Sequence, residues 1–232
     1  MRVLGLDTAT LTASVALVDG ERLLAEADGR ADTHSEKLLP MVERVLAAAG
    51  LTPADLDGVA CGAGPGSFTG LRIGLSTAKG LCFGLGRPLL MISSLRALAD
   101  GGLATARAEG ALVLALLDAK KHELYAGIYD GDGVPVAAEV VLPPARLPDW
   151  VAGRRVVVVG DGASAYPDVA AACGPLVAGA RATPGAAALA RLGAVRLGRG
   201  EVDDVLTAAP TYIRASEAEI ATPPVDRFAR KP

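Results

Sequence analysis

A glycine-rich run from Gly62 to Gly74 is the segment of this chain whose residues could hold a phosphate group. Its glycines allow positive φ angles and close approach of another backbone, and an apolar strand, Val59 to Cys61, leads into it. The run has no Lys-Ser/Thr pair to complete a P-loop, and its glycine spacing is not GxGxxG. We therefore predict neither a P-loop nor a dinucleotide-binding loop.

Nucleophiles and metal ligands in catalytic spacing are also missing from the sequence. Ser67 and Thr69 have no candidate base beside them and no GxSxG elbow, so one of them is predicted to be a helix N-cap. His34 and His122, the two histidines, fit neither HxxxH nor HExxH. We expect no catalytic residue and no metal site, and hence no metalloprotease activity.

Composition indicates a soluble, globular, cytoplasmic protein. The chain has 232 residues, of which 51% are hydrophobic, and charged or turn residues interrupt every apolar run before membrane-spanning length. A net charge of −3 and 3% aromatic residues argue against direct capture of nucleic acid. The three cysteines lack CxxC spacing and lie among apolar residues, which predicts buried, reduced thiols at Cys61, Cys82 and Cys173.

The helix predicted from Thr69 to Gly84 contains four glycines, each of which costs about 1 kcal/mol relative to alanine in a helix interior. At helical spacing its small residues form two stripes, one with Gly70, Gly74, Ala78 and Cys82 and another with Ser76, Gly80 and Gly84. Small stripes permit close helix packing. They seat the helix either on its own sheet or on the helix of a partner.

An internal repeat divides the chain into two halves. A strand that ends in Asp7 is followed by a second strand over 13–20, and a strand that ends in Asp118, 111 residues later, is followed by one over 124–131. Each half continues with a third strand, a helix and a returning strand, at 22–27, 35–49 and 58–61 in the first half and at 136–142, 144–152 and 155–159 in the second.

This order predicts an α/β fold with duplicated ribonuclease-H-like halves, in which helices cover mixed sheets. We assign residues 1–105 to the first half, which carries the dimerisation helices, and 106–221 to the second, with a joint between Gly101 and Gly110. Residues 222–232 are predicted to be a flexible tail with a basic end.

Four segments of the chain resemble the TsaB family, also called YeaZ. They are residues 3–10, the Gly64 to Gly74 run, Asp118-Ala119 with Glu123-Leu124-Tyr125, and Pro210 to Arg214, and the glycine-rich run is the specific signal. The family is the dimerisation subunit of the bacterial machinery that makes threonylcarbamoyladenosine in tRNA. The resemblance implies the actin, sugar-kinase and chaperone-ATPase fold.

The resemblance implies a noncatalytic scaffold that pairs with the catalytic paralogue TsaD and assembles with the ATPase TsaE. Transfer to the adenosine 3′ of the anticodon would then involve tRNA only through the complex, with a homodimer when the chain is alone. We expect no intrinsic cofactor, with ATP/ADP and metal held by partner subunits or at a subunit junction. The expected interface comprises Leu38, Met41, Val42, Val45, Gly70, Arg72, Ile73, Gly74, Thr77, Ala78, Gly80 and Leu81. A large residue at Gly74 is expected to abolish pairing without unfolding the chain.

A vestigial nucleotide site is the remaining candidate. The turn 7–10 stands where ATPases of this fold bind phosphate and magnesium, although their usual glycine is Ala9 here, and Asp7 can equally cap the turn. The loop 160–162 is either the matching phosphate loop or a strand-to-helix turn. The candidate residues are Asp7, Thr8, Thr10, Gly160, Asp161 and Gly162. The alternative function is an autonomous nucleotide hydrolase or small-molecule kinase of the same fold.

Overall fold

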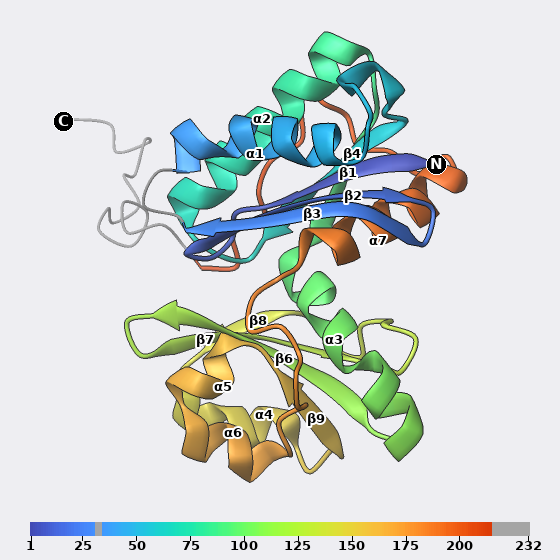
Figure 1. Ribbon diagram of the computed structural model, residues 1–232. Coiled ribbons are helices and arrows are strands. Elements are labelled where there is room, and N and C mark those ends of the chain that lie inside the picture. Colours follow the sequence, from blue (N-terminus) through green and yellow to red (C-terminus); the bar gives the residue numbers. More distant parts are fainter. Residues whose placement is uncertain (31–33, 215–232) are drawn as a thin grey trace, which may run out of the picture.

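The computed structural model describes residues 1–30 and 34–214, and the predicted tail 222–232 lies outside them. The protein contains two separate sheets, one in the upper half and one in the lower half of Figure 1. The first has the strand order β3-β2-β1-β4-β5, with β1 at Arg2–Asp7, β2 at Thr12–Asp19, β3 at Arg22–Arg30, β4 at Gly58–Gly64 and β5 at Leu89–Ser93. β1, β2 and β3 pair antiparallel, whereas β1, β4 and β5 pair parallel.

The second sheet repeats this topology with one strand fewer. Its order is β8-β7-β6-β9, with β6 at Leu112–Lys120, β7 at Glu123–Tyr129, β8 at Val140–Leu142 and β9 at Val156–Val159. β6 pairs antiparallel with β7 and parallel with β9, as β1 does with β2 and β4. The predicted duplication and fold class are confirmed. The third strand expected over 136–142 is shorter than predicted, because only its last three residues pair with β7 in the ladder.

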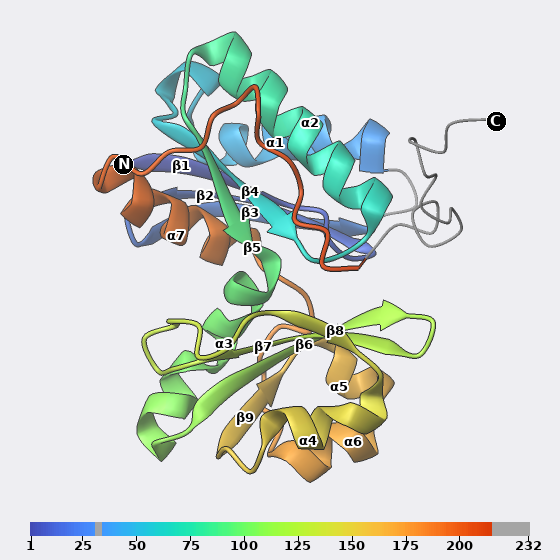
Figure 2. The same ribbon diagram turned by 180° about the vertical axis from the view of Figure 1, so that it is seen from behind.

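Helices cover both faces of the first sheet. α1 (His34–Ala48) and α2 (Phe68–Leu85) lie on one face, and α7 (Ala186–Gly198) lies on the other (Figures 1 and 2). Apolar residues of α1 and α2 pack with Leu4, Val15 and Val59, while those of α7 pack with Val3 and Ala60 on the opposite side. The alternation of side chains along each strand therefore buries both faces of the sheet.

Glycine allows α7 to lie directly on the sheet. A Cβ atom at Gly5 of β1 would be 2.2 Å from the carbonyl oxygen of Ala186, and one at Gly193 would be 2.8 Å from Cβ of Ala60. Because real Cβ atoms do not approach this closely, a larger residue at either position would push the helix away from β1 and β4.

The second sheet is covered by α3 (Ser94–Glu109) on one face and by three short helices on the other, α4 (Leu147–Val151), α5 (Asp161–Ala165) and α6 (Pro167–Cys173). The predicted joint at 101–110 is not a linker but the last turns of α3, which end at Gly110 in the left-handed conformation. The helix expected over 144–152 is a 3-10 turn, Pro144–Arg146, followed directly by α4.

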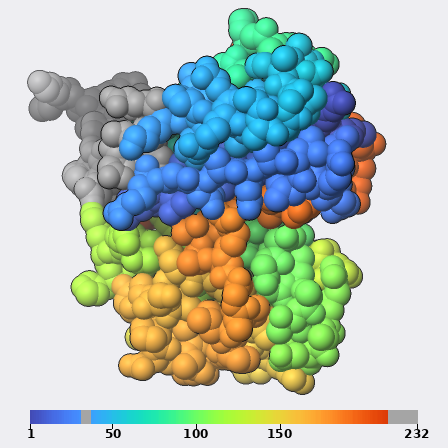
Figure 3. All heavy atoms as spheres, viewed as in Figure 1, coloured from blue at the N-terminus to red at the C-terminus, as the bar shows by residue number. Residues whose placement is uncertain are grey.

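Two helices, α3 and α7, do not follow the division that the sequence suggested at residue 105, because each packs on the sheet of the other half. That position lies inside α3, whose Leu98, Leu103 and Ala106 pack with strands of the second sheet. α7 follows the second half in the sequence and packs on β1, β2 and β4 of the first. The chain that leads to α7, orange in Figure 3, runs across the boundary between the halves. Each helix packs on the sheet that covers its apolar face, even where that sheet belongs to the other half of the sequence.

Candidate functional site

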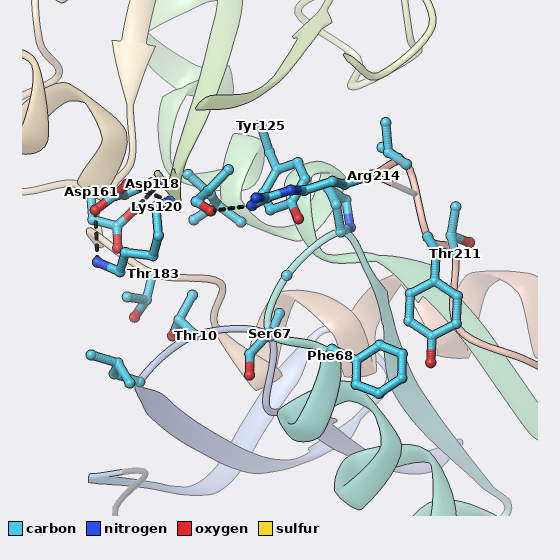
Figure 4. Close-up of a pocket in the computed structure, with 18 of the residues that line it drawn as sticks. Thr10, Ser67, Phe68, Asp118, Lys120, Tyr125, Asp161, Thr183, Thr211 and Arg214 are labelled. Atoms are coloured by element: carbon cyan, nitrogen blue, oxygen red, sulfur yellow. Dashed lines mark hydrogen bonds and ion pairs between the residues drawn. The ribbon is translucent and has the colours of Figure 1, made fainter. Parts of the chain in front are cut away.

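A cleft of about 690 Å³ opens between the two halves. Thr10, Ser67 and Phe68 line it from the first half, and Asp118, Lys120, Tyr125 and Asp161 from the second (Figure 4). Thr211 and Arg214 reach it from the chain that follows α7. The lining residues of the first half follow β1 and β4, and those of the second half lie in the β6–β7 hairpin or follow β9, because these strand ends point towards the same gap.

Most polar groups of the predicted phosphate turn bond within the protein rather than facing this cleft. The buried Asp7 carboxylate accepts hydrogen bonds from the Ala9 N–H at 2.9 Å and the Ser94 hydroxyl at 2.7 Å. Thr8 Oγ1 donates to the Gly70 carbonyl at 2.7 Å, and the Ser67 N–H donates to the Ala9 carbonyl at 2.7 Å. Of the candidates in this turn, Thr10 lines the cleft while Asp7 and Thr8 do not.

Burial sets the chemistry of Asp7. Desolvation raises the pKa of this carboxyl to about 6, although the bonds from Ser94 and Ala9 act in the opposite direction. A Cβ atom at Gly62 would lie 2.2 Å from Oδ2 of Asp7, so the neighbouring strand closes over the carboxylate. Asp7 therefore acts as a cap for the turn after β1, which is one of the two roles that the sequence left open.

The loop 160–162 of the second half has mainly packing roles. Gly160 has a φ of 108°, and a Cβ atom there would be 2.0 Å from the Leu116 carbonyl oxygen, so glycine is needed for the turn from β9 into α5. Gly162 lies against the side chains of Leu116 and Leu124. Asp161 alone of the three lines the cleft, where its Oδ1 accepts a hydrogen bond from the Asp118 N–H at 3.0 Å.

Asp118 and Lys120 were not among the site residues predicted from the sequence, although Asp118 is the repeat of Asp7. Their side chains form an ion pair of 2.7 Å at the end of β6. Burial raises the pKa of Asp161, whereas the hydrogen bond from the Asp118 N–H and the charge of Lys120 act in the opposite direction. Among the side chains that the structure describes, no group of three or more from His, Cys, Asp or Glu could hold a metal ion.

The predicted interface residues divide into a buried and an exposed set. Packed in the core are Leu38, Met41, Val42 and Val45 of α1 and Gly70, Gly74 and Ala78 of α2, so these were wrongly placed on a surface. A Cβ atom at Gly70 or Gly74 would lie 2.1 or 2.2 Å from an oxygen of Thr8. This first glycine stripe therefore packs α2 against the turn after β1 of the same chain. At least partly exposed are Arg72, Ile73, Thr77, Gly80 and Leu81.

The second stripe of α2 faces outwards. We call Arg72, Ser76, Gly80, Phe83 and Gly84, which are all exposed and follow each other at helical spacing, the α2 face. Nothing lies within 4 Å of a Cβ atom built at Gly80 or Gly84, and the Phe83 side chain is 78% exposed. The sequence showed both stripes but not which of them was buried.

Replacing glycine by alanine should change the stability of the protein in opposite directions in the two stripes. Gly74→Ala is expected to lower the free energy of unfolding by about 2 kcal/mol, because the new methyl group collides with Thr8. Gly80→Ala is expected to raise it by roughly 0.5–1 kcal/mol, because the methyl group meets nothing and alanine favours the helix. Urea unfolding of both variants measures the difference. Equal midpoints would contradict the assignment of the stripes.

The remaining predicted features are placed as follows. Ser67 is the N-cap of α2, and its Oγ accepts a hydrogen bond from the Gly70 N–H, as expected. Cys61 and Cys82 are buried free thiols, whereas Cys173 is only partly buried. Among the helices that the structure describes, none is long and apolar enough to cross a membrane.

The duplicated halves, the cleft between them and the turn after β1 define a protein of the actin-like ATPase and sugar-kinase fold. The activator of 2-hydroxyisocaproyl-CoA dehydratase from Clostridium difficile, solved with bound ADPNP, shares this fold at a TM-score of 0.53 with 12% identity, covering 88% of this chain and 99% of that one. The ROK hexokinase from Thermus thermophilus shares it at 0.50 with 17% identity, covering 86% and 100%.

More similar proteins identify the family. A family model described as TsaD, tRNA N6-adenosine threonylcarbamoyltransferase, matches residues 29–222. The tRNA threonylcarbamoyladenosine biosynthesis protein TsaB of Escherichia coli is 33% identical, with 94% of this chain and 96% of that protein covered. YeaZ from Pseudomonas aeruginosa is 34% identical, with a TM-score of 0.74 and coverage of 91% and 100%. The chain belongs to the TsaB (YeaZ) family.

Proposed function

We propose that this chain is a noncatalytic subunit of the machinery that makes threonylcarbamoyladenosine in tRNA, and that it pairs with the catalytic paralogue TsaD. The curated relatives in E. coli and other bacteria are named as biosynthesis proteins of this modification. In this proposal TsaD transfers the threonylcarbamoyl group to the adenosine 3′ of the anticodon, and TsaE joins the assembly. The chain meets tRNA through the complex, in keeping with its net charge of −3.

The observation that carries the proposal is the α2 face. Two of its five residues are exposed glycines in a helix, which together cost about 2 kcal/mol relative to alanine and which no contact within the described chain requires. The Phe83 ring, which lies beside them on the helix, is exposed to water. A partner helix that packs closely on Gly80 and Gly84 and covers Phe83 would offset both costs. Without TsaD, a second copy of the chain would cover the same face.

The noncatalytic role is supported by the bonding of the turn after β1. An ATPase of this fold needs a free carboxylate and free backbone amides beside the phosphates. Here the Asp7 carboxylate is buried and accepts two hydrogen bonds, and Ala9 bonds through both its N–H and its carbonyl group. We propose that ATP/ADP and metal are held by the partner subunits or at a subunit junction.

Reconstitution tests this proposal. The chain, its cognate TsaD and the mixture are run on size-exclusion chromatography with light scattering, and each is assayed for tRNA threonylcarbamoylation with TsaE, threonylcarbamoyl donor and magnesium present. We expect a stable heterodimer, and modification only when both proteins are present. Magnesium-dependent ATP turnover by the chain alone, without a complex, would instead favour the hydrolase or kinase.

A further inference from the structure

The chain after α7 returns along the first half and reaches the cleft at residues 211–214. We call residues 203–214 the strap. Asp203 forms an isolated antiparallel bridge with Leu89 of β5, and the ammonium group of Lys79 in α2 donates to the Leu206 carbonyl oxygen at 3.1 Å. Figure 2 shows the strap running beside α2 to the edge of the first half that lies nearest the β6–β7 hairpin.

Near its end the strap is bound to the start of α2. The Thr211 N–H donates to the Ala63 carbonyl oxygen of β4 at 2.7 Å. The Tyr212 ring lies 5.3 Å from the Phe68 ring, and its hydroxyl accepts a hydrogen bond from Nε of Arg72 at 3.1 Å. The guanidinium carbon of Arg72 lies 3.9 Å from the centre of the Phe68 ring. Three side chains thus hold one another, and one of them belongs to the α2 face.

Two residues further on, the strap contacts the second half. Nη1 of Arg214 donates to the Ala119 carbonyl oxygen at 3.1 Å, and its Nε lies 3.3 Å from Oε2 of Glu123. Ala119 belongs to β6 and Glu123 opens β7, so Arg214 holds the hairpin that forms one wall of the cleft (Figure 4). The Arg214 and Glu123 side chains are 25% and 32% exposed, and partial burial strengthens such a pair relative to fully exposed ones.

We propose that Tyr212 and Arg214 form a latch across the cleft, which positions the second half relative to the partner that covers the α2 face. This inference rests on the proposed function, because Arg72 is the residue shared by the latch and the partner surface. A partner that covers Arg72 excludes water from the Arg72–Tyr212 hydrogen bond and from the contact between Arg72 and Phe68. Both interactions then become stronger. Since only one residue separates Tyr212 from Arg214, their Cα atoms can be at most about 7 Å apart, so fixing the first restricts the second.

Other contacts between the halves allow latch variants to fold. The chain itself crosses at α3 and again before α7. The Arg181 side chain bonds to Asp28 of β3 at 2.7 Å, and Glu139 of the second half accepts a hydrogen bond from Ser93 at the end of β5. Tyr212 and Arg214 are therefore positioning residues: they orient halves that are already joined.

The experiment measures the orientation of the halves directly. Spin labels are placed by Glu21→Cys and Asp149→Cys, two exposed positions on the first and second half, in a Cys173→Ser background with Cys61 and Cys82 left buried. Pulsed dipolar spectroscopy then gives the distance distribution with and without TsaD. We expect the distribution of the otherwise native chain to narrow to roughly half its width when TsaD binds.

Latch variants should separate binding from positioning. Arg214→Ala and Tyr212→Ala are expected to change the dissociation constant for TsaD by no more than about threefold, because Arg214 lies off the α2 face and Tyr212 beside it. In the complex, both variants should keep a broad distribution of spin-label distances and should transfer the threonylcarbamoyl group about tenfold more slowly. Arg214→Lys, which retains the charge without the planar fork, should restore part of the narrowing. Arg146→Ala removes an exposed arginine whose ion pair with Asp149 lies within the second half, and in the unlabelled chain it should leave transfer unchanged.

The outcomes distinguish failure of the latch from failure of the proposed function. If TsaD binds but the distribution does not narrow, or narrows equally in Arg214→Ala, the latch is overturned and the proposed function stands. If TsaD does not bind the native chain, the proposed function fails and the latch fails with it.

Discussion

Gly80→Trp is expected to abolish the complex with TsaD and leave the fold of this chain intact. Gly80 is exposed on the α2 face, and nothing lies within 4 Å of a Cβ atom built there. The Cβ atom of a larger side chain therefore meets no atom of its own chain, the exposed position leaves the ring room in solvent, and replacing a helical glycine should slightly raise the free energy of unfolding. In the complex the indole would occupy the space between two closely packed helices. We expect the dissociation constant to rise by at least about 100-fold, which corresponds to about 3 kcal/mol of overpacking.

Titration of TsaD with each variant measures this effect, and the threonylcarbamoylation assay follows its consequence. The matched control is Val195→Trp on α7, since Val195 is 43% exposed and α7 covers the opposite face of the first sheet. That variant should bind TsaD normally. Equal loss of binding in both variants, or normal binding by Gly80→Trp, would contradict the proposed surface. Gly74→Trp is no substitute for this test, because it would collide with Thr8 and disturb the fold.

Asp7→Asn is expected to stabilise the protein at neutral pH. Burial raises the pKa of Asp7 to about 6 in the folded state, above the value of about 4 that an unfolded aspartate has. Between these two values the folded state binds more protons than the unfolded state, so the free energy of unfolding falls as pH rises from 4 to 6. Above pH 6 the buried charge costs about 3 kcal/mol in all, and asparagine avoids this cost.

Asparagine can keep both contacts of Asp7. Its carbonyl oxygen accepts from the Ala9 N–H, and its amide group can donate to the Ser94 hydroxyl oxygen. Chemical unfolding from pH 4 to pH 8 should show a gain of about 1–3 kcal/mol for the variant at pH 7.5 that disappears near pH 4. Asp168→Asn, at an exposed position, is the control and should change neither end of the profile. A magnesium-dependent ATPase activity that Asp7→Asn removes would contradict the capping role and favour a hydrolase.

Much of the fold was predictable from local patterns. The aspartate-terminated strands at 3–7 and 114–118 and their partner strands alternate and turn in the same way, so the duplication could be recognised without coordinates. The N-cap at Ser67 was likewise predictable, because capping depends on residues within one turn of the helix.

The site was less predictable, because its parts come from distant segments. Asp118, Lys120 and Arg214 meet at the cleft only after the strap has returned past α2. Asp7 and Asp118 lie at the ends of the equivalent strands β1 and β6, yet Asp7 is covered by Gly62 whereas Asp118 lines the cleft. Whether a carboxylate is a ligand or a cap depends on the residues that cover it, which strand patterns do not reveal.

By itself, the sequence determined the class of fold, the order of its elements and the family, because strand alternation, helix period and a thirteen-residue glycine-rich run are local properties of the chain. Only the tertiary structure decided which glycine stripe of α2 faces the core. It also decided that α3 and α7 each cover the sheet of the other half, and that the strap joins both halves at the cleft. These features depend on contacts between separate elements, such as Thr8 with Gly74 and Arg72 with Tyr212, and burial at such contacts is settled by the whole packing of the chain.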